Sequence, residues 1–179
     1  EHVKKRLIAD GWPLQDLEFE PGRIIRGLVI DKEKGNVVKA NRFGYIKKAT
    51  HGTSVLEYSE LREEYARELV DLSDPRWLFV NTLFSISAGT IYLQLVDLLD
   101  AGKLPRLLDY ESLFDRVQEA LDAAHVEGVL KSEIMNNPER FVEADPEMPK
   151  ALLDQKKAGK KLMLITNSGW EYTRFMMSY

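Results

Sequence analysis

The stretch "KKLMLITNSGWEYTRFMM" (Lys160–Met177) combines a strand pattern, a polar break and a helix pattern. Leu162–Ile165 form a continuous apolar run, which is typical of a strand covered on both faces in a parallel α/β sheet. Thr166–Gly169 interrupt the run, and apolar residues then recur with helical spacing from Tyr172 to Met176. Such a helix aims its free N–H groups past the carboxyl end of the strand, where open α/β sheets bind ligands and favour anions. The stretch therefore predicts a strand, a turn with a phosphate site, and a helix.

A second interpretation of the same turn involves no ligand. Asn167 or Ser168 can serve as the N-cap of the following helix, because their side-chain oxygens accept hydrogen bonds from its free N–H groups. The spacing alone leaves both interpretations open.

Composition narrows the class of protein. The 179 residues are 44% hydrophobic and 30% charged, enough for one core or for a domain with part of another. The net charge of -4, without a long run of one sign, argues against nucleic acid as the main partner. The absence of cysteine excludes disulfides and thiolate chemistry and favours an intracellular setting. No apolar run approaches the roughly 18 residues that a membrane-spanning helix needs, so we expect a soluble protein with no membrane partner.

Pattern and turn residues predict the order of elements along the chain. "RIIRGLVIDKEKGNVVKANRFGYIKKATHG" (Arg23–Gly52) contains three strand-like runs separated by turn residues, which indicates a β-meander. "WLFVNTLFSIS" (Trp77–Ser87) is a candidate buried strand. Helices are predicted at 1–8, 58–72, 88–102, 110–126 and 147–158. We expect an α+β region over residues 1–145 and the opening of an α/β core over 146–179.

Both ends of the chain resemble cut ends. The helix at Glu1–Ile8 lacks a starting cap, and the chain stops at Tyr179 directly after its last helix. We therefore expect a segment of a larger protein, with the other strands of the parallel sheet supplied by further residues.

The helix predicted at 110–126 carries a second polar pattern. Gln118, Asp122 and His125 fall within about 60° of one another on one helix face. A carboxylate, an imidazole and an amide grouped in this way can recognise a polar ligand, with Lys131 as a nearby cation. An ordinary solvated helix face has the same spacing, and the pattern alone does not separate the two.

Two other polar residues favour structural roles. Asp31 follows the strand "GLVID" as a nucleophilic aspartate would, but "DKEKGN" has the composition of a hairpin turn. His51 precedes Gly52 and is interpreted as a turn histidine. The spacing of His2, His51 and His125 matches no metal-ligand pattern, so the chain itself predicts no metal site.

Several stretches, taken together and in order, resemble one known family. They are "RGLVID", "GNVVKA", "FVNTLFSI", "LFDRVQEALDAAHVEGVLK" and "KKLMLITNS". The combination is similar to the cytosolic purine 5′-nucleotidases, the IMP/GMP-preferring branch of the haloacid dehalogenase (HAD) superfamily. The resemblance implies an α/β fold with a HAD-like Rossmannoid core and a large α+β cap. Of that core, only the second-motif strand and its flanking helices would lie in this chain.

The resemblance also implies roles for individual residues. Thr166 matches the second-motif hydroxyl that binds the transferring phosphoryl group, with Asn167 and Ser168 as further donors. Such donors stabilise the negative charge that develops during phosphoryl transfer. Residues that match nucleotide-contacting positions of the family are Asp122, His125, Lys131, an aromatic Phe84 that would stack on the purine, and Asn81.

One position departs from the family, and several motifs are absent. Gln118 stands where the purine enzymes carry an arginine, so it offers a hydrogen bond without a charge. The chain has no D-x-D-x-T motif, which would supply the nucleophile, and it lacks the later lysine and acidic pair that would hold Mg²⁺. We therefore expect Mg²⁺ ligands outside this chain and no activity of the chain by itself.

The resulting hypothesis is a segment of a Mg²⁺-dependent 5′-nucleotidase. It would hydrolyse purine nucleoside 5′-monophosphates through an aspartyl-phosphate, and the resemblance implies a cytoplasmic homo-oligomer. A HAD phosphatase with another phosphomonoester substrate and a non-catalytic, nucleotidase-like interaction protein are the alternatives.

Overall fold

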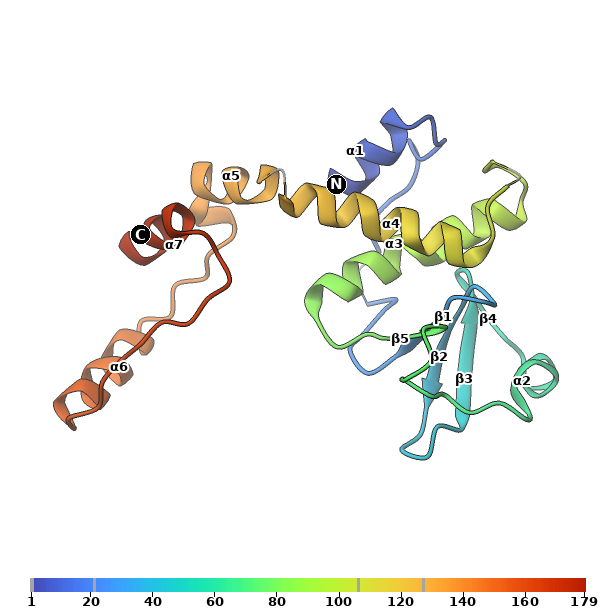
Figure 1. Ribbon diagram of the computed structural model, residues 1–179, viewed down its shortest axis with the longest axis horizontal. Helices are drawn as coiled ribbons and strands as arrows, with labels where there is room; N and C mark the ends of the chain where they lie inside the picture. The colour runs from blue at the N-terminus through green and yellow to red at the C-terminus, as the bar shows by residue number, and fades with distance from the viewer. Residues whose placement is uncertain (1, 21, 106, 127) are drawn as a thin grey trace. The chain divides into compact units, whose positions relative to one another are not determined.

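The computed structural model describes residues 2–20, 22–105, 107–126 and 128–179, and the side chains of His125 and Val126 lie outside this description (Figure 1). The chain forms two compact units, Glu1–Ala123 and Ala124–Tyr179. The helices are α1 (His2–Ala9), α2 (Tyr58–Tyr65), α3 (Leu83–Asp100), α4 (Tyr110–Val126), α5 (Val129–Asn136), the 3₁₀ helix η1 (Pro138–Arg140), α6 (Met148–Lys157) and α7 (Trp170–Ser178). The strands are β1 (Val29–Asp31), β2 (Asn36–Ala40), β3 (Ile46–His51), β4 (Ser54–Val55) and β5 (Trp77–Phe79). The fold is mixed α/β, and the predicted division after residue 145 stays a prediction.

The first unit contains a five-stranded antiparallel sheet in the order β4-β3-β2-β1-β5. The meander predicted over Arg23–Gly52 is confirmed as β1, β2 and β3. Gly35, with a φ of 67°, provides the left-handed residue in the turn between β1 and β2.

The two faces of this sheet pack against different elements, as alternating strand residues require. Ile30 and Val37 are paired across β1 and β2, and both join the core cluster formed with α1, α3 and α4. Val29 and Val38, the next pair, join a second cluster on the other face, which includes Tyr65 of α2. Figure 1 shows α2 beside β3 and β4. Burial on both faces fixes the register, because a slip by one residue would exchange the two sets.

The strand predicted over Trp77–Ser87 is wrong beyond Phe79. Thr82 caps α3, because its hydroxyl accepts a hydrogen bond from the Ser85 N–H while Ser85 Oγ accepts one from the Thr82 N–H. This capping box ends the extended segment inside an apolar run. By length and composition, α3 could span a membrane. The sequence patterns did not predict this, because polar residues interrupt its apolar run. Its buried residues belong to the core of the first unit, which also accounts for that composition.

The helix predicted at 58–72 is shorter than expected. α2 ends at Tyr65, because the following residues pair with the turn between β2 and β3. Leu69 forms a bridge with Tyr45, and the Val70 N–H donates to the Gly44 carbonyl oxygen at 2.9 Å. The helices predicted at 110–126 and 147–158 are confirmed as α4 and α6.

The strand predicted at Leu162–Ile165 is wrong for the described structure. These residues form no strand, and their exposed fractions range from 50% to 82%. A strand needs neighbours for its backbone N–H and C=O groups. All five strands within the described residues belong to the sheet of the first unit. The parallel HAD-like core therefore stays a proposal.

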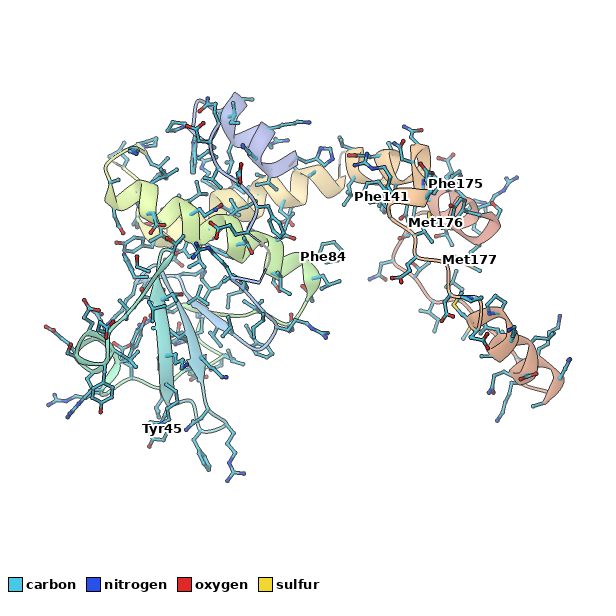
Figure 2. All side chains as sticks on the ribbon, turned by 180° about the vertical axis from the view of Figure 1, so that it is seen from behind. Tyr45, Phe84, Phe141, Phe175, Met176 and Met177 are labelled. Atoms are coloured by element: carbon cyan, nitrogen blue, oxygen red, sulfur yellow. The ribbon has the colours of Figure 1, made fainter. Side chains whose placement is uncertain are left out.

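The second unit is helical in its described residues. α5, which the sequence patterns did not predict, contacts both η1 and α7. The predicted amphipathic pattern of α7 is confirmed, because Tyr172, Phe175 and Met176 are half-buried while its other face is exposed (Figure 2).

Candidate functional site

The polar segment Thr166–Ser168 lies directly before α7, as the sequence predicts. Thr166 and Asn167 are exposed, and Ser168 is half-buried. The Ser168 N–H donates to Thr166 Oγ1 at 3.1 Å, which closes a short turn. The turn places a hydroxyl, an amide and a second hydroxyl in sequence at the start of a helix.

The alternative interpretation of this segment as a helix cap is not supported. The N-cap of α7 is Gly169, and no side chain makes a capping hydrogen bond to the described helix. The N–H groups of the first turn of α7 are among the donors that a helix start leaves without intrahelical partners. The segment and the helix start therefore offer donors to an anion, although Glu171 adds a negative charge to the same turn.

Lys131 of α5 lies close to the same turn. Its ammonium nitrogen is 5.4 Å from the centre of the Tyr172 ring, in the first turn of α7. A cation over an aromatic face is attracted by the ring electrons. This contact places a positive charge over the ring of a residue in the first turn of α7. Lys131 was predicted as a site residue from the sequence, but Tyr172 was not. The feature that could have indicated Tyr172 is an aromatic residue three positions after Gly169, in the first turn of the helix.

Gln118 and Asp122 form a direct pair on α4. Gln118 Nε2 donates to Asp122 Oδ1 at 2.9 Å, so the predicted i, i+4 arrangement is present. The pair is accessible, because Asp122 is exposed and Gln118 is half-buried. The second N–H of the amide, its carbonyl oxygen and Asp122 Oδ2 stay available for other contacts. The side chain of His125, the third member of the predicted face, lies outside the described side chains.

Phe84 and Asn81 lie around the start of α3. Phe84 is the second residue of the helix and 57% exposed, and Asn81 directly precedes the N-cap Thr82 (Figure 2). An exposed aromatic at a helix start can stack on a planar ligand.

The candidate residues are divided between the two units. Asn81, Phe84, Gln118 and Asp122 belong to the first, whereas Lys131 and Thr166–Ser168 belong to the second. Within each unit, the structure brings Gln118 to Asp122 and Lys131 to Tyr172 of α7.

Asp31 and His51 have the structural roles that the sequence favours. Asp31 is fully buried and accepts two hydrogen bonds from Arg76, at 2.7 and 2.6 Å. It also accepts from the Glu33 N–H in the hairpin turn. His51, the last residue of β3, contacts Asn36 and Asp100 with its two ring nitrogens.

The described residues do not fit the expected Mg²⁺ as a resident ion. No group of three His, Cys, Asp or Glu side chains among them is arranged to hold a metal. Mg²⁺ is held by carboxylate oxygens, often one or two of them together with substrate phosphates.

The sequence of the chain matches the profile of the 5′ nucleotidase family over residues 1–179. The chain therefore belongs to the 5′-nucleotidase family. It is 28% identical over 171 residues to 5′-nucleotidase domain-containing protein 1 of Bos taurus. It is 29% identical over 174 residues to the protein of the same name from Homo sapiens. Each alignment covers 86% of this chain and 37% of the relative, so the chain spans little more than a third of these curated relatives.

Proposed function

We propose that the whole protein hydrolyses purine nucleoside 5′-monophosphates of the IMP/GMP type, and that this chain supplies phosphate-binding and base-recognising residues. Membership of the 5′-nucleotidase family supports hydrolysis of a nucleoside monophosphate. The observation that carries the proposal is the position of Lys131 over Tyr172, at the helix start that follows Thr166–Ser168.

The phosphate-binding part of the proposal uses three kinds of donor. Thr166 Oγ1, the free N–H groups at the start of α7 and the Lys131 ammonium differ in strength and geometry, but each stabilises negative charge. Developing charge on the phosphoryl oxygens is what phosphoryl transfer requires an enzyme to stabilise. Asn167 and Ser168 add donors beside Thr166.

The base-recognising part uses Gln118 and Asp122. A 6-oxopurine presents an N1–H donor, and guanine adds a 2-amino group. Asp122 Oδ2 and the carbonyl oxygen of Gln118 are both acceptors, so the pair suits an edge that carries donors. Phe84 supplies a ring for stacking, and His125, Asn81 and Lys131 are further candidates for nucleotide contacts.

The remaining parts of the proposal concern the whole protein. We place the nucleophilic aspartate of an aspartyl-phosphate mechanism, the Mg²⁺ ligands and most of a HAD-like core outside the 179 residues. We further propose a cytoplasmic homo-oligomer without nucleic-acid or membrane partners.

The experiment measures phosphate release by the whole protein from IMP, GMP, AMP, UMP and a small phosphomonoester, with Mg²⁺ and with EDTA. We expect Mg²⁺-dependent release that is faster from IMP and GMP. Preference for the small phosphomonoester would favour another HAD phosphatase, and no release from any substrate would favour a non-catalytic protein. The 179-residue chain alone should release no phosphate above background, and turnover by it would contradict the proposed division of residues.

A further inference from the structure

A row of hydrogen-bonded side chains connects the sheet of the first unit to the first residue of α4. Its members are, in order, Asp31, Tyr65, Asn36, His51, Asp100 and Tyr110. The row crosses from β1 through α2, β2 and β3 to the last residue of α3 and then to α4. His51 is the one histidine in the row and occupies its middle.

The first half of the row has a fixed direction. Arg76 donates two hydrogen bonds to Asp31, and an arginine is always charged, so this partner holds Asp31 as a carboxylate. Tyr65 Oη donates its single hydrogen to Asp31 Oδ2 at 2.8 Å, and burial raises the pKa of this phenol well above its usual range. Tyr65 Oη therefore accepts from Asn36 Nδ2, which lies 2.7 Å away.

The orientation of Asn36 then determines one ring nitrogen of His51. Since Nδ2 of Asn36 faces Tyr65, Asn36 Oδ1 faces His51 Nδ1 at 2.7 Å. An amide oxygen only accepts, so His51 Nδ1 must carry a hydrogen. Turning the amide around would place its oxygen against Tyr65 Oη, whose hydrogen already points to Asp31.

The second half of the row determines the other nitrogen. His51 Nε2 lies 2.8 Å from Asp100 Oδ2, and Tyr110 Oη donates to Asp100 Oδ1 at 2.8 Å. A carboxylate that already receives the tyrosine hydrogen has none to donate to the ring. His51 Nε2 must therefore carry a hydrogen as well. A ring with hydrogens on both nitrogens is an imidazolium.

The charges around the ring suit this positive form. His51 borders a cavity of about 510 Å³ whose charged lining residues are Glu33, Lys34, Glu60, Glu63 and Glu64. Lys34 is itself paired with Glu64 at 2.7 Å. Carboxylates thus outnumber the single ammonium, and Asp100 adds another negative charge beside His51 Nε2. The Tyr110 ring meets the imidazole edge to face, with centroids 5.5 Å apart.

Tyr110 connects the row to the position of α4. The main-chain oxygen of Tyr110 accepts from Tyr92 Oη of α3 at 3.0 Å. Its ring lies against Gly35, where an added Cβ would stand 2.7 Å from the Tyr110 ring. Tyr110 therefore holds the start of α4 through three contacts, made by its hydroxyl, its main-chain carbonyl and its ring.

We propose that His51 is a positioning residue whose ring, protonated on both nitrogens, holds the start of α4 through Asp100 and Tyr110. The consequence for Gln118 and Asp122, further along the same helix, rests on the proposed function. The protonated ring and the anchored helix start do not depend on it.

The protonation is tested by long-range ¹H–¹⁵N spectra of the histidine rings in the whole protein at pH 7. We expect both His51 nitrogens to show the signature of protonated imidazole nitrogens. In Asp100→Asn, the new amide can donate to a bare Nε2 and still accept from Tyr110, so the ring should become neutral. One bare nitrogen in the wild type would overturn the proposal.

The anchoring is tested by hydrogen exchange of the amides in the N-terminal half of α4. Tyr110→Phe removes only the hydroxyl that reaches Asp100, so the His51 ring signals should stay those of an imidazolium. The loss of one hydrogen bond should speed exchange in this half of α4 roughly fivefold. Tyr45→Phe, at the exposed hairpin end labelled in Figure 2, is the matched control and should change neither. Unchanged exchange in Tyr110→Phe would overturn the positioning role.

A kinetic comparison separates this proposal from the proposed function. In the whole protein, Tyr110→Phe should raise KM for a nucleotide while kcat for a small phosphomonoester stays unchanged. If the wild type hydrolyses no nucleotide, the proposed function fails, while the ring spectra and exchange rates still decide the role of His51. Equal effects on both substrates would contradict a role in base recognition.

Discussion

The ammonium nitrogen of Lys131 lies 5.4 Å from the centre of the Tyr172 ring, so a cation of α5 reaches the first turn of α7. Replacing Lys131 by Ala in the whole protein should lower kcat/KM at least about tenfold, since contacts to charged groups contribute about 1.5 to 3 kcal/mol. The loss should be similar for every phosphomonoester, because the phosphate is common to all. Kinetics with IMP and with a small phosphomonoester measure this.

Lys150→Ala is the matched control for this change. Lys150 is an exposed lysine on α6, and its ammonium pairs with the carboxylate of Glu147, three residues earlier, at 2.7 Å. Its loss should leave both rates unchanged. A fall confined to IMP in Lys131→Ala would move the lysine from phosphate binding to base or ribose contacts.

Thr166 provides a second test of phosphate binding. Thr166→Ala removes one donor, and losing one donor to a developing oxyanion typically costs about 3 kcal/mol, or roughly a hundredfold in kcat. The fold should persist, because Thr166 is exposed and its hydroxyl accepts only the Ser168 N–H. Ser178→Ala, at the other end of α7, is the control. Wild-type turnover by a folded Thr166→Ala protein would leave the turn with a purely structural role.

Stability depends on the buried pair of Asp31 and Arg76. Asp31→Asn keeps the shape of the side chain but removes its charge, and breaking a buried ion pair typically costs about 3 to 5 kcal/mol. We expect the lower end of that range, because Arg76 keeps ion pairs with Glu68 and Glu33. Urea unfolding measures the loss, with the exposed Asp16→Asn as control. A change below about 1 kcal/mol would mean that Asp31 contributes little beyond its hairpin turn.

The sequence predicted elements whose cause is local. The limits of α4 follow from its own apolar spacing, and the hairpin at Asp31 follows from its turn residues. The partner of Asp31 did not follow, because Arg76 lies 45 residues further along the chain. Leu162–Ile165 have the composition of a buried strand, but a strand also needs neighbours with which to pair. The composition of a segment does not show whether such neighbouring strands are present.

The candidate site shows the same limit. Spacing on a single helix predicted that Gln118 and Asp122 share a face, and the hydrogen bond between them agrees. The contact of Lys131 with Tyr172 depends on how α5 packs against α7, and α5 itself was not predicted. Residues on one element are therefore predictable from periodicity, whereas residues brought together by packing are not.

Alkaline pH should weaken the anchoring of Tyr110. Burial, followed by the hydrogen bond to Asp100 and the charge of that carboxylate, raises the pKa of Tyr110 from 10.0 to about 12. A raised pKa means that the folded state favours the neutral phenol, so its contribution to stability is complete below pH 10 and disappears as the pH rises through about 12.

The measurement is the free energy of unfolding of wild type and Tyr110→Phe from pH 8 to pH 12. The difference in free energy of unfolding between the two proteins should be constant from pH 8 to pH 10 and shrink from pH 10 to pH 12. Other ionising groups are common to both proteins and do not affect this difference. A difference that grows with pH would contradict the assigned direction of the shift.

The last prediction concerns the choice of base by Asp122. An ionised carboxylate accepts from the N1–H of hypoxanthine or guanine, whereas adenine presents a bare N1 acceptor that it would repel. A site built to bond a substrate group discriminates strongly, because the wrong ligand leaves a polar group unpaired at about 1 to 3 kcal/mol. Asp122→Ala in the whole protein should therefore lower kcat/KM for IMP and GMP at least about tenfold and leave AMP nearly unchanged.

Gln118 refines this prediction. Its amide donates to Asp122 Oδ1, which directs the carbonyl oxygen and Asp122 Oδ2 to other partners. Guanine offers two adjacent donors and hypoxanthine one, so Gln118→Ala should reduce kcat/KM for GMP more than for IMP. Glu119→Ala, an exposed neighbour on α4, is the control. An equal fall for every substrate in Asp122→Ala would make this carboxylate structural, and an unchanged ratio of IMP to AMP would place base recognition elsewhere in the protein.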